Sequence, residues 1–423
     1  MGSPAVSKQT RIALYVVFAI LMMALGSSDS LRGVFAPVFA EHFTLTASDL
    51  SLIITVSYIG NLVFMLLGTR IADSFGLRLV FIATMLLWMA ALALYLVTDN
   101  FILLLIGMFF AMGGSTLLNI MLNLMSPLLF AAPGMILNTL FFTQGIGTTF
   151  SQSAISATVD SFVDWKIVNG VLLVMGAVAV IGFAFLSRGI QGLTRARKSE
   201  QQDGAASQDS AAQQESAVQH GSAAPKVSYM EIVKYPAFWF LFLIFGFYFV
   251  AEHGVMNWVN IYLIQGKGLS SAEAAIFPAL FFGGITVGRL ILSKLVDKMG
   301  IMGSLRLCFI SGTVIYLIAY VIGGNAYYLF ALAGFLLSII YPTTMLAVQL
   351  YFPAYNAATA TGVIMAVATI FDIAFNAVFG YIIDSVGYDL SMMLMPIAMV
   401  LSTATFLLFE RMRSLRLRDD LSK

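Results

Sequence analysis

Two ionisable residues interrupt a long apolar stretch in the second half of the sequence. Glu252 and His253 are adjacent in YFVAEHGVMNWVNIYL, and Asn257 and Trp258 follow them. Because a charged side chain at the centre of a bilayer costs at least about 3 kcal/mol, such a residue is by default a functional-site candidate. Glu252 is therefore the first candidate to bind a proton or a solute hydroxyl. Trp258 offers a flat ring that could stack on a sugar, and a place in the lipid interface is its structural alternative.

Two more charged residues, Asp29 and Arg32, lie in the first apolar stretch. They are three residues apart, so on a helix their side chains can pair. One interpretation is a self-neutralised structural pair lining a water-filled cavity. The other has Asp29 exchanging a proton or binding a hydroxyl, with Arg32 engaging an anionic group. Asn123, in the fourth apolar stretch, is a further candidate ligand contact.

A third intramembrane acid, Asp372, has Asn376 four residues later. One helical turn separates them, so Asn376 can hold the carboxylate by hydrogen bonding. The pair is either a proton site or a polar contact that packs helices, and the sequence leaves both open.

Motifs of the common enzymes are missing from these residues. Glu252 and His253 are adjacent, so they do not form the i, i+4 pair of a zinc helix. The sequence also lacks a phosphate-binding glycine loop that ends in Lys-Ser/Thr. We expect no metal, no cofactor and no enzymatic activity, and movement of any solute would be driven by a gradient.

The elements that position these residues are membrane-spanning helices. Of the 423 residues, 60% are hydrophobic and 10% are charged, and the mean hydropathy is +0.93. A soluble domain carries about 25% charged residues. The apolar stretches approach the roughly 20 residues that a helix needs to cross a bilayer. The predicted fold class is an all-α integral membrane protein with twelve transmembrane helices.

The twelve predicted spans fall into two groups of six. They cover residues 12–39, 50–69, 79–97, 101–125, 135–158 and 167–186, then 237–263, 273–293, 303–323, 326–350, 357–383 and 390–409. Between the groups lies a stretch rich in Gln, Ser and Ala that has too few apolar residues to form a core. We therefore expect a six-helix bundle over 1–187, a disordered linker with a short surface helix over 188–235, and a second bundle over 236–423.

Basic residues fix the predicted orientation in the membrane. If twelve spans alternate, eighteen Lys and Arg residues fall at one face and two, Lys166 and Lys267, at the other. Positive charge accumulates on the cytoplasmic side of membrane proteins. Both termini and the linker are therefore predicted to be cytoplasmic, in a multi-pass protein of the cytoplasmic membrane.

The two halves repeat each other at one constant offset. LTASD at 45–49 aligns with LSSAE at 269–273, and Gly60 aligns with Gly284. The same offset places Asp29 opposite His253. Tandem repeats of this kind are typical of alternating-access transporters, which place one binding site at the midplane between the repeats.

A loop motif also occurs twice at this offset, as GTRIADSFGLR and as GRLILSKLVDKMG. In both copies a carboxylate lies three residues before a glycine that permits a tight turn. The motif resembles the signature loop of the major facilitator superfamily, although Thr69 and Ser293 stand where the family usually has glycine. The resemblance implies a gating role for Asp73, Gly76, Arg78, Asp297 and Gly300.

The spacing of Tyr248, Glu252, Trp258 and Tyr262 resembles the seventh helix of the fucose-permease-like branch of that superfamily. This resemblance implies proton symport of a small polar organic solute such as a sugar, and Arg32 leaves a carboxylate-like solute open. The implied partners are solute, protons and membrane lipid, without nucleic acid, and the protein is expected to be a monomer. One departure is that the fourth span, 101–125, has no acidic residue and no arginine.

Two other functions stay open. The first is proton-coupled efflux of drugs or metabolites, although the glycine-proline pair typical of such antiporters in the fifth helix is absent. The second is a transporter-fold sensor that binds its ligand without moving it. Counterflow of labelled solute separates a sensor from a transporter.

Overall fold

The computed structural model describes residues 7–130, 133–188, 190, 232–352 and 354–421. Most of these residues are helical and none of them lies in a strand, which confirms the all-α fold class. The elements are α1 (Lys8–Val34), α2 (Ala36–His42), α3 (Ala47–Phe75), α4 (Leu77–Val97), α5 (Phe101–Leu129), α6 (Pro133–Phe150), the π-helix η1 (Ser151–Ile155), α7 (Phe162–Leu186), α10 (Pro236–Ile261), the π-helix η3 (Tyr262–Gly266), α11 (Ser271–Ile322), the 3₁₀ helix η4 (Gly324–Leu329), α12 (Phe330–Leu337), α13 (Ile340–Tyr351), α14 (Ala354–Met392) and α15 (Leu394–Leu421).

Within the described residues, eleven helices are long and apolar enough to cross a membrane. The remaining predicted span, 135–158, corresponds to α6 and the π-helix η1 that continues it. The expectation of twelve spans therefore agrees with the structure. The predicted disordered linker and surface helix fall almost entirely on residues 191–231, which lie outside the described part of the chain.

Three predicted spans are interrupted, and a proline follows each interruption. One of them, the span predicted over 390–409, breaks at Met393 between α14 and α15, and Pro396 follows. The span predicted over 12–39 breaks at Phe35, between α1 and α2. The span predicted over 326–350 begins as the 3₁₀ helix η4 and breaks again between α12 and α13. Pro37 and Pro342 lie just after the breaks, and a proline lacks the N–H of a helical hydrogen bond and clashes with the carbonyl four residues earlier. The predicted bounds of these spans did not specify the breaks.

In α11 two predicted spans, 273–293 and 303–323, follow each other without a loop. Only Gly300 departs from helical geometry, with φ 72° and ψ 169°. Gly387 does the same in α14, with φ 80° and ψ 169°. Other residues rarely adopt such positive φ angles, so glycine is needed for these sharp changes of direction.

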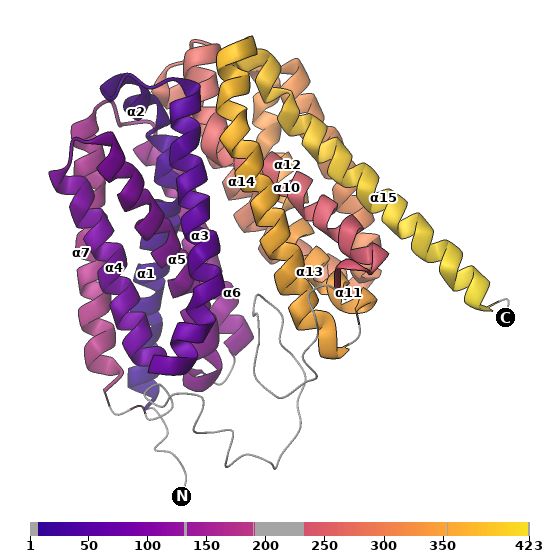
Figure 1. The fold of residues 1–423 in the computed structure, drawn as a ribbon, viewed down its shortest axis with the longest axis horizontal. Helices are drawn as coiled ribbons and strands as arrows, with labels where there is room; N and C mark the ends of the chain where they lie inside the picture. Colours follow the sequence, from indigo (N-terminus) through magenta and orange to yellow (C-terminus); the bar gives the residue numbers. More distant parts are fainter. Residues whose placement is uncertain (1–6, 131–132, 189, 191–231, 353, 422–423) are drawn as a thin grey trace, which may run out of the picture. The chain divides into compact units, whose positions relative to one another are not determined.

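The chain forms two compact units. The first comprises Met1–Thr44, Leu52–Ser151 and Val159–Ala217, and the second comprises Leu45–Ser51, Gln152–Thr158 and Val218–Lys423. In the first unit α1 packs against α6 and α7, while α4 packs against α5 and α7. In the second, α10 packs against α14 and α15, while α11 packs against α12 and α15. The helices of each unit run side by side as a bundle (Figure 1).

The aligned glycines Gly60 and Gly284 serve the same purpose in the two units. A Cβ at Gly60 would collide with the carbonyl of Phe109, so α3 and α5 are in backbone contact there. A Cβ at Gly284 would collide with the carbonyl of Ala331, which brings α11 against the start of α12. Small residues permit such close approach of membrane helices. The repeat in the sequence is thus a repeat in packing.

Candidate functional site

Four predicted site residues of the second unit form one hydrogen-bonded network. His253 Nδ1 lies 2.7 Å from Asp372 Oδ2. Asn376 donates from Nδ2 to Asp372 Oδ1 at 3.0 Å, and Trp258 donates from its indole N–H to Asn376 Oδ1 at 3.1 Å. Helices α10 and α14 supply two residues each. The one-turn spacing of Asp372 and Asn376 lets the amide reach the carboxylate, as the sequence predicted.

Within this network Asp372 and His253 differ in accessibility. The side chain of Asp372 is 1% exposed and that of His253 is 25% exposed. The ring of Phe249 stacks on the imidazole at 5.2 Å between centroids. The half-buried imidazole is therefore the more accessible partner of the buried carboxylate.

Trp258 is part of the packed interior of the second unit. It is 1% exposed, and its ring packs edge-on against Phe379 at 5.1 Å. In this structure its face is therefore covered by protein, and its polar edge holds Asn376. Asn257 is also 1% exposed.

Glu252 has a different set of neighbours from His253. Its carboxylate lies within hydrogen-bonding range of the Tyr248 hydroxyl, and within electrostatic range of Tyr316. The Tyr248 hydroxyl also donates to the carbonyl of Leu337 at 3.2 Å, and that of Tyr316 donates to the carbonyl of Ala251 at 2.7 Å. Glu252 is half-buried, with the two tyrosines Tyr248 and Tyr316 near it. The two adjacent ionisable residues thus serve separate polar clusters.

In the first unit Asp29 joins α1 to α5. The Ser115 hydroxyl donates to Asp29 Oδ2 at 3.1 Å. The other carboxylate oxygen, Oδ1, is buried and accepts no hydrogen bond from the described residues. Leaving a buried acceptor unsatisfied costs about 1–3 kcal/mol, and more for a charged group. Asp29 therefore has a free position for a proton or a donor group of a ligand.

Arg32 lies in electrostatic range of Asp29 and points toward other partners as well. Its guanidinium donates to the Tyr58 hydroxyl at 3.2 Å and lies 4.7 Å from the centre of that ring. A second nitrogen contacts the Met112 sulfur at 3.3 Å. Arg32 is 4% exposed. These contacts tie the cation to α3 and α5, and Asp29 supplies nearby negative charge.

Asn123 continues the polar side of α5 one turn beyond Asn119. Its side-chain nitrogen donates to the Asn119 carbonyl at 3.0 Å. The side-chain oxygens of both residues are buried without a hydrogen-bond partner in the described part of the chain. With Asp29, they form a set of unused acceptors within the first unit.

Both glycines of the predicted gating loops have positive φ, 81° at Gly76 and 72° at Gly300. The Arg78 guanidinium donates to the Ser187 hydroxyl at 2.9 Å and to the Ala184 carbonyl at 3.1 Å. It thereby holds the end of α7, where the helix dipole favours a cation. The side chains of Asp73 and Asp297 lie outside the described residues.

Some polar residues near these clusters escaped the sequence interpretation. Ser115 and Tyr58 are common residue types in apolar helices, and no spacing connects them with Asp29 or Arg32. Asp384 precedes Gly387 in a third Asp-x-x-Gly sequence. Its carboxylate accepts from the backbone N–H groups of Ala47 and Ser48 at 3.0 and 2.9 Å. A search for further copies of the loop motif would have found it.

Comparison with solved structures shows the fold. A bacterial homologue of the human lysosomal transporter Spinster, inward-facing and unoccupied, aligns with a TM-score of 0.69 at 14% identity, covering 96% of this chain and 98% of that chain. A D-xylose-proton symporter aligns with 0.68 at 12% identity, covering 93% and 97%. A variant of the E. coli fucose:proton symporter FucP aligns with 0.58 at 15% identity, covering 94% and 98%.

A search of curated proteins finds no match. The family model of the Major Facilitator Superfamily, by contrast, matches residues 17–374. This range includes parts of both units and both copies of the loop motif, and it ends between Asp372 and Asn376. The chain belongs to the major facilitator superfamily.

Proposed function

We propose that the protein moves a small polar organic solute across the cytoplasmic membrane by proton symport, with both termini in the cytoplasm. The observation that carries the proposal is the contact between His253 and the buried Asp372. Two of the structures with this fold, the D-xylose-proton symporter and the fucose:proton symporter, are named for the same kind of transport. Glu252 and Asp29 are the other proposed proton or hydroxyl sites.

Coupling follows from the charge of the His253–Asp372 pair. Without an added proton, a neutral imidazole beside a carboxylate carries one net negative charge. Binding one proton makes the pair neutral overall, whether the proton resides on the imidazole or on the carboxyl group. A buried net charge is expensive, so protonation lowers the cost of conformations that bury the pair. Protonation then favours the change between outward-facing and inward-facing conformations that also moves the solute.

The polar groups of the first unit favour a solute that donates hydrogen bonds. Asp29 Oδ1 and the side-chain oxygens of Asn119 and Asn123 are buried acceptors without described partners. Hydroxyl groups of a sugar or polyol would satisfy such acceptors. A carboxylate would face the same oxygens with repulsion, and the nearby Arg32 already contacts Tyr58 and Met112. A neutral hydroxylated solute is therefore the better fit.

The test is uptake by purified protein in proteoliposomes. A thermal-shift screen with D-xylose, L-fucose and lactate first identifies a usable solute, because a bound solute stabilises the folded state. With Asp372→Asn, accumulation driven by an imposed pH gradient should fall at least about ten-fold, which corresponds to roughly 1.4 kcal/mol. Counterflow of labelled solute without a gradient should persist. Asp99→Asn, at a carboxylate that is 63% exposed, is the control.

Full proton-driven accumulation by Asp372→Asn would remove Asp372 from the mechanism. Glu252→Gln tests the other acid of the second unit in the same way, since full accumulation by this variant would exclude Glu252. An absence of counterflow in the unmodified protein, for a solute that binds, would favour the sensor.

A further inference from the structure

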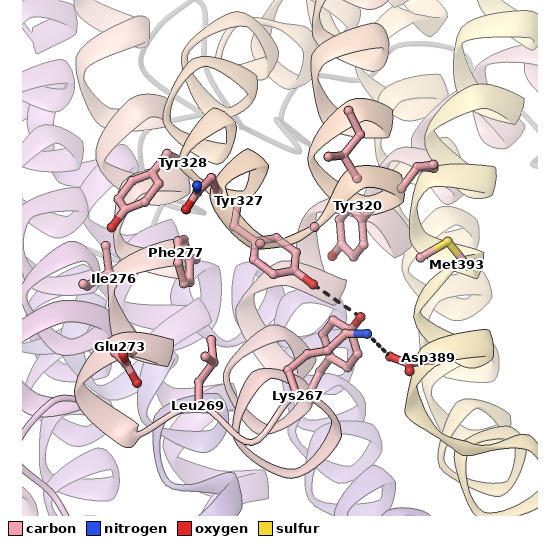
Figure 2. A pocket seen from close by; sticks show the side chains of 16 residues that line it. Lys267, Leu269, Glu273, Ile276, Phe277, Tyr320, Tyr327, Tyr328, Asp389 and Met393 are labelled. Carbon is pink, nitrogen blue, oxygen red and sulfur yellow. Dashed lines mark hydrogen bonds and ion pairs between the residues drawn. The ribbon is translucent and has the colours of Figure 1, made fainter.

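A cavity of about 650 Å³ lies in the second unit, and none of its lining residues belongs to the Asp372 network. It is bordered by the π-helix η3, both ends of α11, the 3₁₀ helix η4 and the last turns of α14. In Figure 2 the labelled aromatic side chains extend across the view, and the charged side chains Glu273, Lys267 and Asp389 lie below them. Its volume is in the range of small-molecule sites.

Five aromatic rings line this cavity, from Tyr262, Phe277, Tyr320, Tyr327 and Tyr328. The Tyr262 and Tyr327 hydroxyls are 3.5 Å apart. Tyrosine rings offer apolar faces together with a polar edge. Tyr328 is 56% exposed, whereas the other four rings are 2–7% exposed, so Tyr328 is the ring with surface available for stacking. The lining therefore combines one stacking surface with groups for hydrogen bonding.

The three charged residues of the lining already have partners. The Lys267 ammonium lies 2.7 Å from Asp389 Oδ1 and 5.6 Å from the centre of the Tyr262 ring. Figure 2 shows this ion pair at the edge of the cavity. Glu273 accepts from the backbone N–H and the hydroxyl of Ser270, at 3.0 and 2.7 Å, at the start of its own helix. A charged ligand would have to compete with these contacts.

We propose that this cavity binds a neutral polyhydroxylated compound, a monosaccharide or polyol. The exposed ring of Tyr328 packs against the C–H face of such a compound. The Tyr hydroxyls and the Asn325 amide can donate hydrogen bonds to its hydroxyls or accept them, and the remaining lone pairs of Asp389 accept them. The ion pair between Lys267 and Asp389 can stay intact, because a neutral ligand demands no counter-charge.

The position of the cavity suggests its part in transport. Tyr262 lies four residues after Trp258, whose indole holds Asn376 in the Asp372 network. One helical turn thus connects the cavity wall with that network. The charge pattern of the sequence places Lys267 on the outer face. The cavity is then an outer subsite for the transported solute. This role rests on the proposed function, whereas the proposed binding of a neutral compound does not depend on it.

Binding is tested by saturation-transfer NMR on the purified full-length protein. The probes are D-xylose, L-fucose, D-glucose and inositol, with lactate and tetraethylammonium as charged comparisons. Tyr328→Ala removes a lining ring that is 56% exposed, and Tyr381→Ala, at a tyrosine that is 59% exposed outside the lining, is the matched control. Removing one stacking ring should raise the apparent Kd of a neutral probe roughly five-fold. Ile276→Trp should block the cavity.

A neutral probe weakened by Tyr328→Ala and Ile276→Trp, and unaffected by Tyr381→Ala, supports the site. If these variants weaken the binding of lactate or tetraethylammonium alone, the proposed ligand class is wrong. If they change the affinity of no probe, the proposed site is wrong. Asp372→Asn separates this proposal from the transport mechanism, because the variant should keep binding at the cavity. Normal proton-driven uptake by Asp372→Asn would contradict the proposed transport mechanism and leave the proposed cavity site unaffected.

Discussion

At the scale of single residues, Asp372 shows how a costly buried acid is accommodated. Its two carboxylate oxygens have separate partners, His253 on one and Asn376 on the other. The sequence predicted Asn376 because it is one turn away on the same helix. The contact with His253 spans 119 residues, and no local pattern encodes a pair of this separation. The sequence therefore identified the members of the network but not their arrangement.

Asp372→Ala should destabilise the protein more than Asp372→Asn. Alanine removes the carboxylate oxygen that faces His253 and one of the two acceptors of the Asn376 amide nitrogen, which keeps the Asp372 carbonyl at 2.9 Å. A buried polar group left without a partner costs about 1–3 kcal/mol. Asparagine keeps one oxygen that can accept a hydrogen bond. Thermal unfolding of the purified variants in detergent measures the difference. Equal unfolding temperatures for the two variants would show that these hydrogen bonds contribute little to stability.

At the scale of helices, glycine and proline both determine where helices turn or break, and only the turns at Gly76 and Gly300 were predicted from the sequence. The turn at Gly300 was predicted because Asp-x-x-Gly recurs, and the positive φ of Gly76 and Gly300 confirms the physical reason for glycine. The breaks before Pro37 and Pro342 were missed because apolar character continues through them. Hydrophobicity indicates which segments are buried in the membrane, and it does not indicate where a helical backbone hydrogen bond is missing.

Gly60→Ala and Gly284→Ala should both destabilise their units, whereas Gly170→Ala should not. A methyl group at either of the first two sites meets a backbone carbonyl, which cannot move without shifting a helix. Overpacking of this kind costs about 1–3 kcal/mol. At Gly170 the nearest atom to a new Cβ is Leu96 Cδ2 at 3.7 Å, an ordinary contact. Alanine there gains helix propensity of roughly 1 kcal/mol.

The measurement is again the thermal unfolding temperature of the purified proteins. Gly170→Ala is the matched control, since it adds the same methyl group inside a spanning helix. If Gly60→Ala unfolds at the same temperature as Gly170→Ala, α3 and α5 do not require close backbone contact.

At the scale of the whole molecule, the repeat was the most informative feature of the sequence. The aligned pair Gly60 and Gly284, and the aligned pair Gly76 and Gly300, occupy equivalent places in the two units. The positions of membrane helices follow from the length of apolar segments, and their close packing follows from small residues. Both features can be identified in a single sequence. The partners of Asp29 and Arg32 depend on side-chain packing between helices, so they emerged only with the structure.

The orientation in the membrane is a further property of the whole molecule, and cysteine labelling tests it. Cys308 is the single cysteine of the chain and is buried, so Cys308→Ala provides a background without thiols. In that background Ala272→Cys lies near Lys267 on the face with little positive charge, and Ser207→Cys lies in the linker. An impermeant maleimide should label Ala272→Cys in intact cells, and Ser207→Cys only after permeabilisation. Eighteen basic residues on one face against two on the other predict this result. If the orientation is the reverse of the predicted one, every loop changes sides. Labelling of Ser207→Cys in intact cells would therefore place the Tyr262 cavity on the cytoplasmic side.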